Sequence, residues 1–148
     1  MELAEIIKPQ LVVYDLESTT QQEVIDQMAD LFVKQKIITD KAEFIDSVFK
    51  REKTGTTGIG AGIAIPHGQA DTVTESAVAI AKLKEPLEWH ALDEKPVKYV
   101  FLLAIPQKGS SEHLKLLSQL AETLMDDDVR QDLVKSTSAN DIIKIFKK

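Results

Sequence analysis

Hydrophobic residues recur along the chain with two different periods, which together predict strands and helices. Apolar runs or alternating patterns typical of strands occupy residues 11–16, 63–65, 77–83 and 97–105. The last of these is almost unbroken from Tyr99 to Ile105, so we expect it to be buried on both faces of a central sheet.

Apolar residues at spacings of three and four predict helices between these strands. One helix begins after Ser18, Thr19 and Thr20, whose hydroxyls suit an N-cap. A second begins at Asp40, which forms a capping-box pattern with Glu43, and ends before Gly55. Further helices are expected after Ser110 and Ser111, with apolar residues from Leu114 to Leu124 on one side, and around residues 127–135 and 139–147. Strands and helices interleave without strict alternation, so we predict an α/β fold with a mixed parallel and antiparallel central sheet flanked by helices.

The composition of the chain excludes some classes of partner and favours one cellular compartment. The chain has 148 residues, a formal net charge of -6 and no cysteine. This length suits one compact domain, residues 1–148, and no repeat or linker divides it. The acidic balance argues against a nucleic-acid partner, and the missing cysteines exclude disulfides and thiol nucleophiles. The sequence has neither a signal-peptide pattern nor an apolar run of about 20 residues, so we expect a cytoplasmic protein without membrane insertion.

A glycine-rich stretch precedes one of the three histidines. Four glycines fall within residues 55–62, and Pro66, His67 and Gly68 follow shortly after. Dinucleotide and Walker patterns fit poorly, because residues 63–67 read as a strand and no Gly-Lys-Ser/Thr occurs. Two interpretations stay open: a flexible connection, or a bed of backbone N–H groups that holds an anion. The neighbouring Arg51, threonine hydroxyls and imidazole favour a phosphate.

The histidines suggest nucleophilic chemistry more than metal binding. His67, His90 and His113 have no short-range pairing of the kind that binds zinc, and no cysteine assists them. A G-x-S-x-G elbow for a serine hydrolase is also missing. His67 lies between proline and glycine, His113 falls in the first turn of a predicted helix, and His90 in a loop suits surface packing equally well. A neutral imidazole can accept and pass on a phosphoryl group without a metal or cofactor, and we expect neither.

Two long segments resemble a known family. The stretch 51-REKTGTTGIGAGIAIPHG-68 resembles the signature of type-2 enzyme IIA domains, the fructose/mannitol class of the bacterial sugar phosphotransferase system. The segment 97-VKYVFLLAIPQKGSSEHLKLLSQLAETL-124 resembles the second block of that family. The resemblance covers essentially the whole chain and implies a compact α/β fold with a mixed sheet flanked by helices.

The resemblance also implies a function and assigns site residues. His67 corresponds to the histidine that accepts a phosphoryl group from the phosphocarrier protein HPr and passes it to a cysteine of the cognate enzyme IIB, which serves the membrane enzyme IIC. His113 corresponds to the second active-site histidine, which stabilises the phosphate. Arg51 corresponds to the arginine that balances charge or docks the donor, and Thr57 is expected to place a hydroxyl near the phosphate. Residues 89–97 look more like the fructose-type domains, while regulatory relatives of nitrogen metabolism share the motif and are the alternative.

Overall fold

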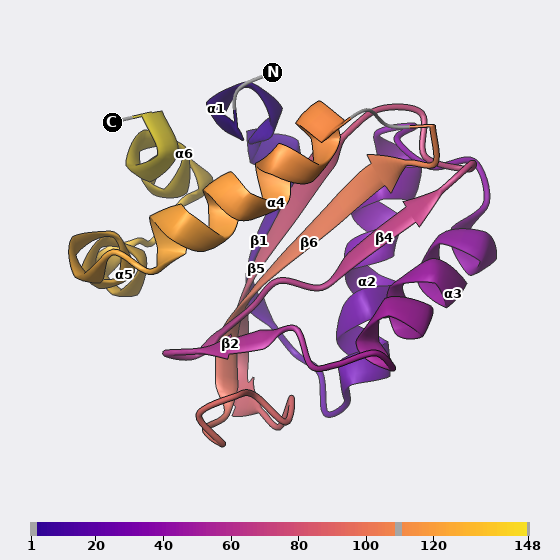
Figure 1. Ribbon diagram of the computed structural model, residues 1–148. Helices are drawn as coiled ribbons and strands as arrows, with labels where there is room; N and C mark the ends of the chain where they lie inside the picture. The colour runs from indigo at the N-terminus through magenta and orange to yellow at the C-terminus, as the bar shows by residue number, and fades with distance from the viewer. Residues whose placement is uncertain (1–2, 109–110, 148) are drawn as a thin grey trace.

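One open sheet forms the centre of the molecule (Figure 1). The computed structural model describes residues 3–108 and 111–147, and of residues 111–113 the backbone alone. The strands are β1 (Val12–Leu16), β2 (Gly58–Gly60), β3 (Ile63–Ala64), β4 (His67–Ala70), β5 (Ala77–Leu87) and β6 (Val97–Pro106). The helices are α1 (Leu3–Ile6), the 3₁₀ turn η1 (Pro9–Leu11), α2 (Gln21–Lys34), α3 (Lys41–Glu52), α4 (Ser111–Leu124), α5 (Asp127–Lys135) and α6 (Ala139–Lys147).

The strand order in this part of the chain is β1-β5-β6-β3-β2, with β4 also paired to β6. The β5–β6 and β2–β3 pairs are antiparallel, whereas β1–β5, β3–β6 and β4–β6 are parallel. This mixed sheet with helices on its faces confirms the predicted fold class.

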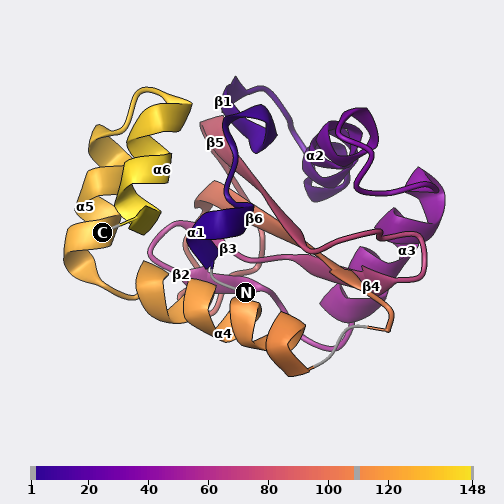
Figure 2. The same ribbon diagram turned by 90° about the horizontal axis from the view of Figure 1, so that it is seen from above.

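Helices cover the sheet on both faces (Figure 2). The pair α2 and α3 lies on one side, and α1, α4, α5 and α6 lie on the other. Along β5, Ala79 and Ala81 belong to the core under α2 and α3, while Val78 and Ile80 belong to the opposite core. Successive side chains of a strand point to opposite faces, so β5 and β6 contribute to both cores. Residues 99–105 of β6 are all buried and alternate between the two cores, so the prediction that this run is buried on both faces is confirmed.

Side-chain caps start the two helices whose N-termini the sequence predicts. The Thr20 hydroxyl accepts a hydrogen bond from the Glu23 backbone N–H at 3.1 Å. The Asp40 carboxylate accepts one from the Glu43 backbone N–H, also at 3.1 Å. Each cap satisfies one of the N–H groups that a helix start leaves without an intrahelical partner. In the described part of the chain, no helix is long and apolar enough to cross a membrane.

Within the described residues, four short elements are present that the hydrophobic pattern does not predict. They are α1, η1, β2 and β4; η1 takes Leu11 out of the strand expected at residues 11–16, and β2 and β4 lie in or beside the glycine-rich stretch. The strand expected at residues 77–83 is also longer, because β5 continues through Pro86 to Leu87, which pairs with Val97 after a register shift. Backbone pairing with neighbours distant in sequence creates these strands, and hydrophobic periodicity does not record such pairing.

Helix α3 lies directly against the backbone of β4. A Cβ atom built on Gly68 would lie 2.4 Å from Ser47 Oγ and 2.9 Å from Val48 Cγ2, both on α3. These distances are too short for real atoms, so only glycine allows the helix and strand to approach this closely. Gly68 directly follows His67, and its close packing therefore fixes the backbone next to the candidate nucleophile.

Replacing Gly68 with alanine is expected to lower the free energy of unfolding by about 1–3 kcal/mol, because the packed helix must move. Urea denaturation monitored by circular dichroism measures this change. Ser47→Ala in the same background should recover only part of the loss, because Val48 remains in the way. An unchanged denaturation midpoint for Gly68→Ala would contradict the close approach.

Candidate functional site

His67 is the first residue of β4, on an interrupted strand path beside β6. Ile63 and Ala64 of β3 pair with the first half of β6, and β4 resumes the same parallel pairing with His67 beside Leu103. Pro66 falls between the two strands and has no N–H to donate, although its carbonyl accepts from the Leu103 N–H at 3.0 Å. Residues in register on neighbouring strands share a face, so His67 is directed to the face that α4 covers.

One backbone carbonyl orients the His67 ring. His67 Nδ1 lies 3.1 Å from the carbonyl oxygen of Ile65. A carbonyl can only accept a hydrogen bond, so in this contact Nδ1 carries the proton and donates it. The neutral ring then has its free lone pair on Nε2, the atom that can act as a nucleophile.

Arg51 lies in the last turn of α3, where its positive charge suits the helix C-terminus. Its Nη1 donates to Thr54 Oγ1 at 3.0 Å and to the Gly55 carbonyl at 2.9 Å. Both of these bonds to described residues use Nη1, so they hold the guanidinium in place and leave its other N–H groups for an anion. The structure thus places Arg51 at the start of the glycine-rich stretch with a fixed orientation.

Burial and two nearby charges set the protonation of His67. The pKa of His67 is lowered, mainly because the half-buried ring loses solvation and further because of the positive charge of Arg51. The hydrogen bond from the ring to Ile65 and the negative charge of Glu52 act in the opposite direction and raise it. Because the net pKa lies below the usual histidine value, the imidazole is neutral and nucleophilic at pH 7.

Thr57 is buried, with 5% of its surface exposed, and its hydroxyl is engaged on both sides. Its Oγ1 donates to Glu52 Oε1 and accepts from Trp89 Nε1 at 3.2 Å, while its backbone N–H donates to Glu52 Oε2 at 3.1 Å. The structure therefore brings Thr57 close to Arg51 through the adjacent Glu52. The sequence singled out neither Glu52 nor Trp89 as a site residue, since a carboxylate beside an arginine is common on helices and the tryptophan is expected in a loop.

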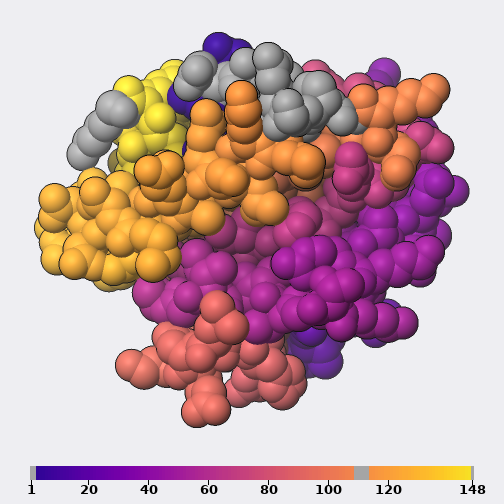
Figure 3. All heavy atoms as spheres, viewed as in Figure 1, coloured from indigo at the N-terminus to yellow at the C-terminus, as the bar shows by residue number. Residues whose placement is uncertain are grey.

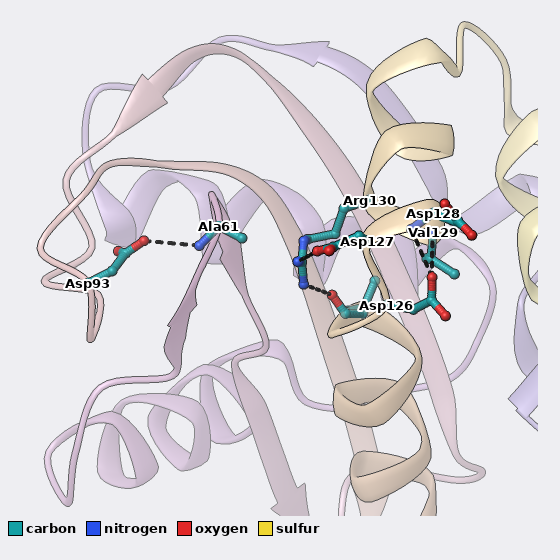
Figure 4. A network of polar contacts seen from close by, with 8 residues as sticks. Ala61, Asp93, Asp126, Asp127, Asp128, Val129 and Arg130 are labelled. Carbon is teal, nitrogen blue, oxygen red and sulfur yellow. Dashed lines mark hydrogen bonds and ion pairs between the residues drawn. The ribbon is translucent and has the colours of Figure 1, made fainter.

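The glycine-rich stretch is a hydrogen-bonded hairpin of β2 and β3 whose outer side contacts the loop between β5 and β6. The Gly58 carbonyl accepts from the Leu92 N–H at 2.9 Å, and Asp93 Oδ2 accepts from the Ala61 N–H at 3.0 Å (Figure 4). At the hairpin tip Gly60 and Gly62 adopt positive φ values of 106° and 78°, which glycine tolerates best. These contacts argue against a merely flexible connection.

A second set of contacts in Figure 4 fixes the start of α5. The Asp126 carboxylate accepts from the backbone N–H groups of Asp128 and Val129, and Arg130 pairs with Asp127.

Figure 3 shows the surface around the glycine-rich stretch: atoms of residues 50–70 occupy the middle of one face, with α4 above them and the β5–β6 loop below.

The other two histidines occupy different environments. His113 lies in the first turn of α4, on the face toward which His67 is directed, and its side chain lies outside the described residues. His90 lies in the β5–β6 loop with 86% of its side chain exposed, and its Nδ1 is 3.7 Å from the Glu88 carboxylate. Among the side chains that the structure describes, no group of three or more histidine, aspartate or glutamate residues could hold a metal ion.

Comparison with known proteins assigns the chain to a family. The sequence model described as "Phosphoenolpyruvate-dependent sugar phosphotransferase system, EIIA 2" matches residues 5–148. The chain belongs to this family. EIIA domains are phosphotransfer components, and the matched range contains every site residue discussed above.

Relatives of this EIIA domain include both transport and regulatory proteins. The fructose-specific EIIA component of Haloferax volcanii is 34% identical over 137 residues, which cover 93% of this chain and 89% of the relative. The crystal structure of the nitrogen regulatory protein IIA-Ntr from Neisseria meningitidis has a TM-score of 0.89 and 31% identity, covering 97% of this chain and 98% of that one. The same fold occurs in the complex of Escherichia coli enzyme IIA for mannitol with phosphorylated enzyme IIB, with a TM-score of 0.79, 21% identity, and coverage of 95% and 96%.

Neutralising Arg51 by substitution with glutamine is expected to raise the pKa of His67, because the arginine charge is one of the causes that lower it. A pH titration of the ring by NMR measures the change. Lys50→Gln is the matched control: it makes the same charge change one residue earlier, at an exposed side chain whose Nζ lies 3.1 Å from Asp46. A lower pKa in Arg51→Gln, or equal changes in both variants, would contradict this electrostatic account.

Proposed function

We propose that this EIIA domain carries a phosphoryl group on Nε2 of His67, receiving it from phosphorylated HPr and passing it to a cysteine of the cognate enzyme IIB during sugar uptake. The observation that carries the proposal is the hydrogen bond from His67 Nδ1 to the Ile65 carbonyl. That bond keeps the proton on Nδ1 and leaves Nε2 as the nucleophile. The lowered pKa of His67 supports the same assignment, because a protonated ring has no lone pair to offer.

The transfer takes two successive displacements at phosphorus, one that loads His67 and one that unloads it. The Nε2 lone pair of His67 attacks the phosphorus of phospho-HPr, and the bond from phosphorus to HPr breaks with its electrons returning to HPr. In the second step the IIB thiolate attacks the same phosphorus, and the bond to Nε2 breaks. The Nδ1 proton remains on the ring throughout, and the Ile65 carbonyl stabilises the positive charge that phosphorylation places on the imidazole.

Three further features suit a transferring phosphoryl group. Arg51 offers a positive charge whose orientation is fixed by Thr54 and Gly55. The glycine-rich hairpin directly precedes His67 in the chain, and His113 lies in the first turn of α4, where the N–H groups of a helix N-terminus favour an anion. We assign His113 and Arg51 to stabilisation of the phosphate oxygens in the transition state, where charge stabilisation contributes most to the rate.

One of the compared relatives supports a fructose-type transport role for this chain. The Haloferax volcanii relative is named as a fructose-specific component. The mannitol enzyme of the same fold was solved together with phosphorylated enzyme IIB, so an equivalent IIB is the acceptor we propose here. The sugar itself need not contact this domain, and transfer assays against IIB proteins of several sugar classes would identify the acceptor.

The regulatory alternative has its own supporting observation. IIA-Ntr of Neisseria meningitidis, a nitrogen regulatory protein, matches this chain over nearly its whole length. In that case the phosphorylation state of His67 would control binding to a target protein. If wild-type phosphoprotein is formed but no fructose-type IIB accepts the group, the regulatory function is the better conclusion.

Incubation with phosphoenolpyruvate, enzyme I and HPr is expected to add one acid-labile phosphate to the wild-type protein and none to His67→Ala. Intact mass before and after acid treatment measures this directly. His90→Ala is the control, because it removes an exposed imidazole from the neighbouring loop and should leave phosphorylation unchanged. Phosphate on His67→Ala would refute the proposed acceptor.

For His113→Ala we expect phosphorylation of His67 to persist while transfer to enzyme IIB slows about 10- to 100-fold, because a stabilising group of the transition state is lost. Quenched-flow measurement of phosphate loss from the isolated phosphoprotein gives the rate. An unchanged transfer rate would remove the proposed role of His113.

A further inference from the structure

Trp89 is a buried polar aromatic residue for which the proposed phosphoryl chemistry has no direct use. It lies in the connection between β5 and β6, yet 1% of its surface is exposed and it packs in the core beneath α2 and α3. Its indole N–H donates to Thr57 Oγ1 at 3.2 Å. The indole is therefore both a core side chain and a hydrogen-bond donor directed at the segment next to the candidate site.

The donor and acceptor roles are fixed in the hydrogen bonds that join Trp89, Thr57 and Glu52. The indole N–H of Trp89 can only donate, and the carboxylate of Glu52 can only accept. The Thr57 hydroxyl between them must therefore accept from the indole and donate to the carboxylate. With the Thr57 backbone N–H on its second oxygen, Glu52 is held at both oxygens by one residue.

Further contacts bind Trp89 and the hairpin into one unit. The Thr56 hydroxyl donates to the Trp89 carbonyl at 3.2 Å and accepts from the Gly58 N–H at 3.1 Å. A Cβ on Gly58 would lie 2.8 Å from the Cα atom of Ala91, so the backbones of the hairpin and the β5–β6 loop are in direct contact. A shift of the indole therefore moves the segment that carries Thr57.

Thr57 can influence His67 in two ways, through backbone hydrogen bonds and through the charge of Glu52. Through the backbone, the Thr57 carbonyl accepts from the Ile65 N–H at 3.0 Å, and the Ile65 carbonyl accepts from His67 Nδ1. Through charge, Glu52 acts on the His67 ring with the opposite sign to its neighbour Arg51. Among the described side chains these two are the charged groups that act on the ring, both from α3, and the His113 side chain of α4 lies outside that set.

We propose that Trp89, acting through Thr57, is a positioning residue of the phosphoryl-transfer site: it holds the Glu52 carboxylate beside Arg51 and keeps the Ile65 carbonyl aligned with the His67 ring. The Thr57 hydroxyl then serves Glu52 instead of contacting the phosphate. This proposal rests on the proposed function and deepens it. Its competitor is that Trp89 only fills the core, in which case its N–H bond satisfies a buried donor and affects stability alone.

The matched pair Thr57→Val and Thr57→Ser tests the hydroxyl link. Valine has nearly the same shape without the hydroxyl, whereas serine keeps the hydroxyl. We expect Thr57→Val to lower the pKa of His67, because the released Glu52 no longer offsets Arg51, and to slow phosphorylation by phospho-HPr about 10-fold. Thr57→Ser should keep both the His67 pKa and the phosphorylation rate at their wild-type values. The ring titration and tautomer are read by NMR, and the rate by rapid quench.

A cycle of variants tests whether Trp89 acts through Glu52. Trp89→Phe removes the indole N–H and should shift the His67 titration in the same direction as Thr57→Val. Glu52→Gln should lower the pKa of His67 on its own, and adding Trp89→Phe to it should lower the pKa by less than Trp89→Phe does in the wild-type protein, because only the link through the Ile65 carbonyl remains. Tyr14→Phe is the control: it removes hydrogen bonds to Ser136 and Ser138 on the other face of the sheet and should leave the titration unchanged.

The results separate this proposal from the proposed function. Folded Thr57→Val and Trp89→Phe proteins with wild-type His67 titration and phosphorylation rate would overturn the positioning role and leave the phosphocarrier function standing. Equal and independent effects of Trp89→Phe with and without Glu52 would overturn it as well. A wild-type protein that HPr never phosphorylates would overturn the proposed function, while the NMR titrations would still decide whether Trp89 positions His67.

Discussion

The break in the strand path beside β6 is the constraint on which the site depends. The chain from Ile63 to Ala70 runs parallel to β6 throughout, but Pro66 cannot donate to the ladder, so regular pairing stops and resumes at His67. At this break the Ile65 carbonyl accepts from the imidazole. The same few atoms thus set the direction of the ring, the tautomer and the nitrogen that remains free, and the rest of the sheet keeps the break in register.

The close packing and the charges around this break act together. Gly68 lets α3 approach β4, and the C-terminus of α3 carries the adjacent opposite charges of Arg51 and Glu52 to the site. A phosphocarrier must accept a doubly charged phosphoryl group and release it again. A site that attracted or repelled this group strongly would hinder one of the two steps. A held carboxylate beside a held guanidinium provides such a balance.

The long, strongly patterned elements could be predicted from the sequence, because burial on both faces of β6 and the caps at Thr20 and Asp40 leave local signals. The glycines and the Pro-His-Gly sequence also indicated His67 as the candidate acceptor, a role that stays a prediction. Strand order, β2 and β4 could not be predicted, since they depend on pairing between distant segments. Burial of Trp89 could not be predicted for the same reason, because residues distant in sequence, including Thr57 of the hairpin, form its surroundings.

The most direct measurement of the central claim is heteronuclear NMR of the phosphorylated protein with ¹⁵N-labelled histidine. The account predicts a phosphorus–nitrogen coupling at Nε2 of His67, with Nδ1 still protonated and bonded to the Ile65 carbonyl. Phosphorus on Nδ1 of His67, or on any other residue, would contradict the account, because the hydrogen bond at the strand break would then not select the nucleophile.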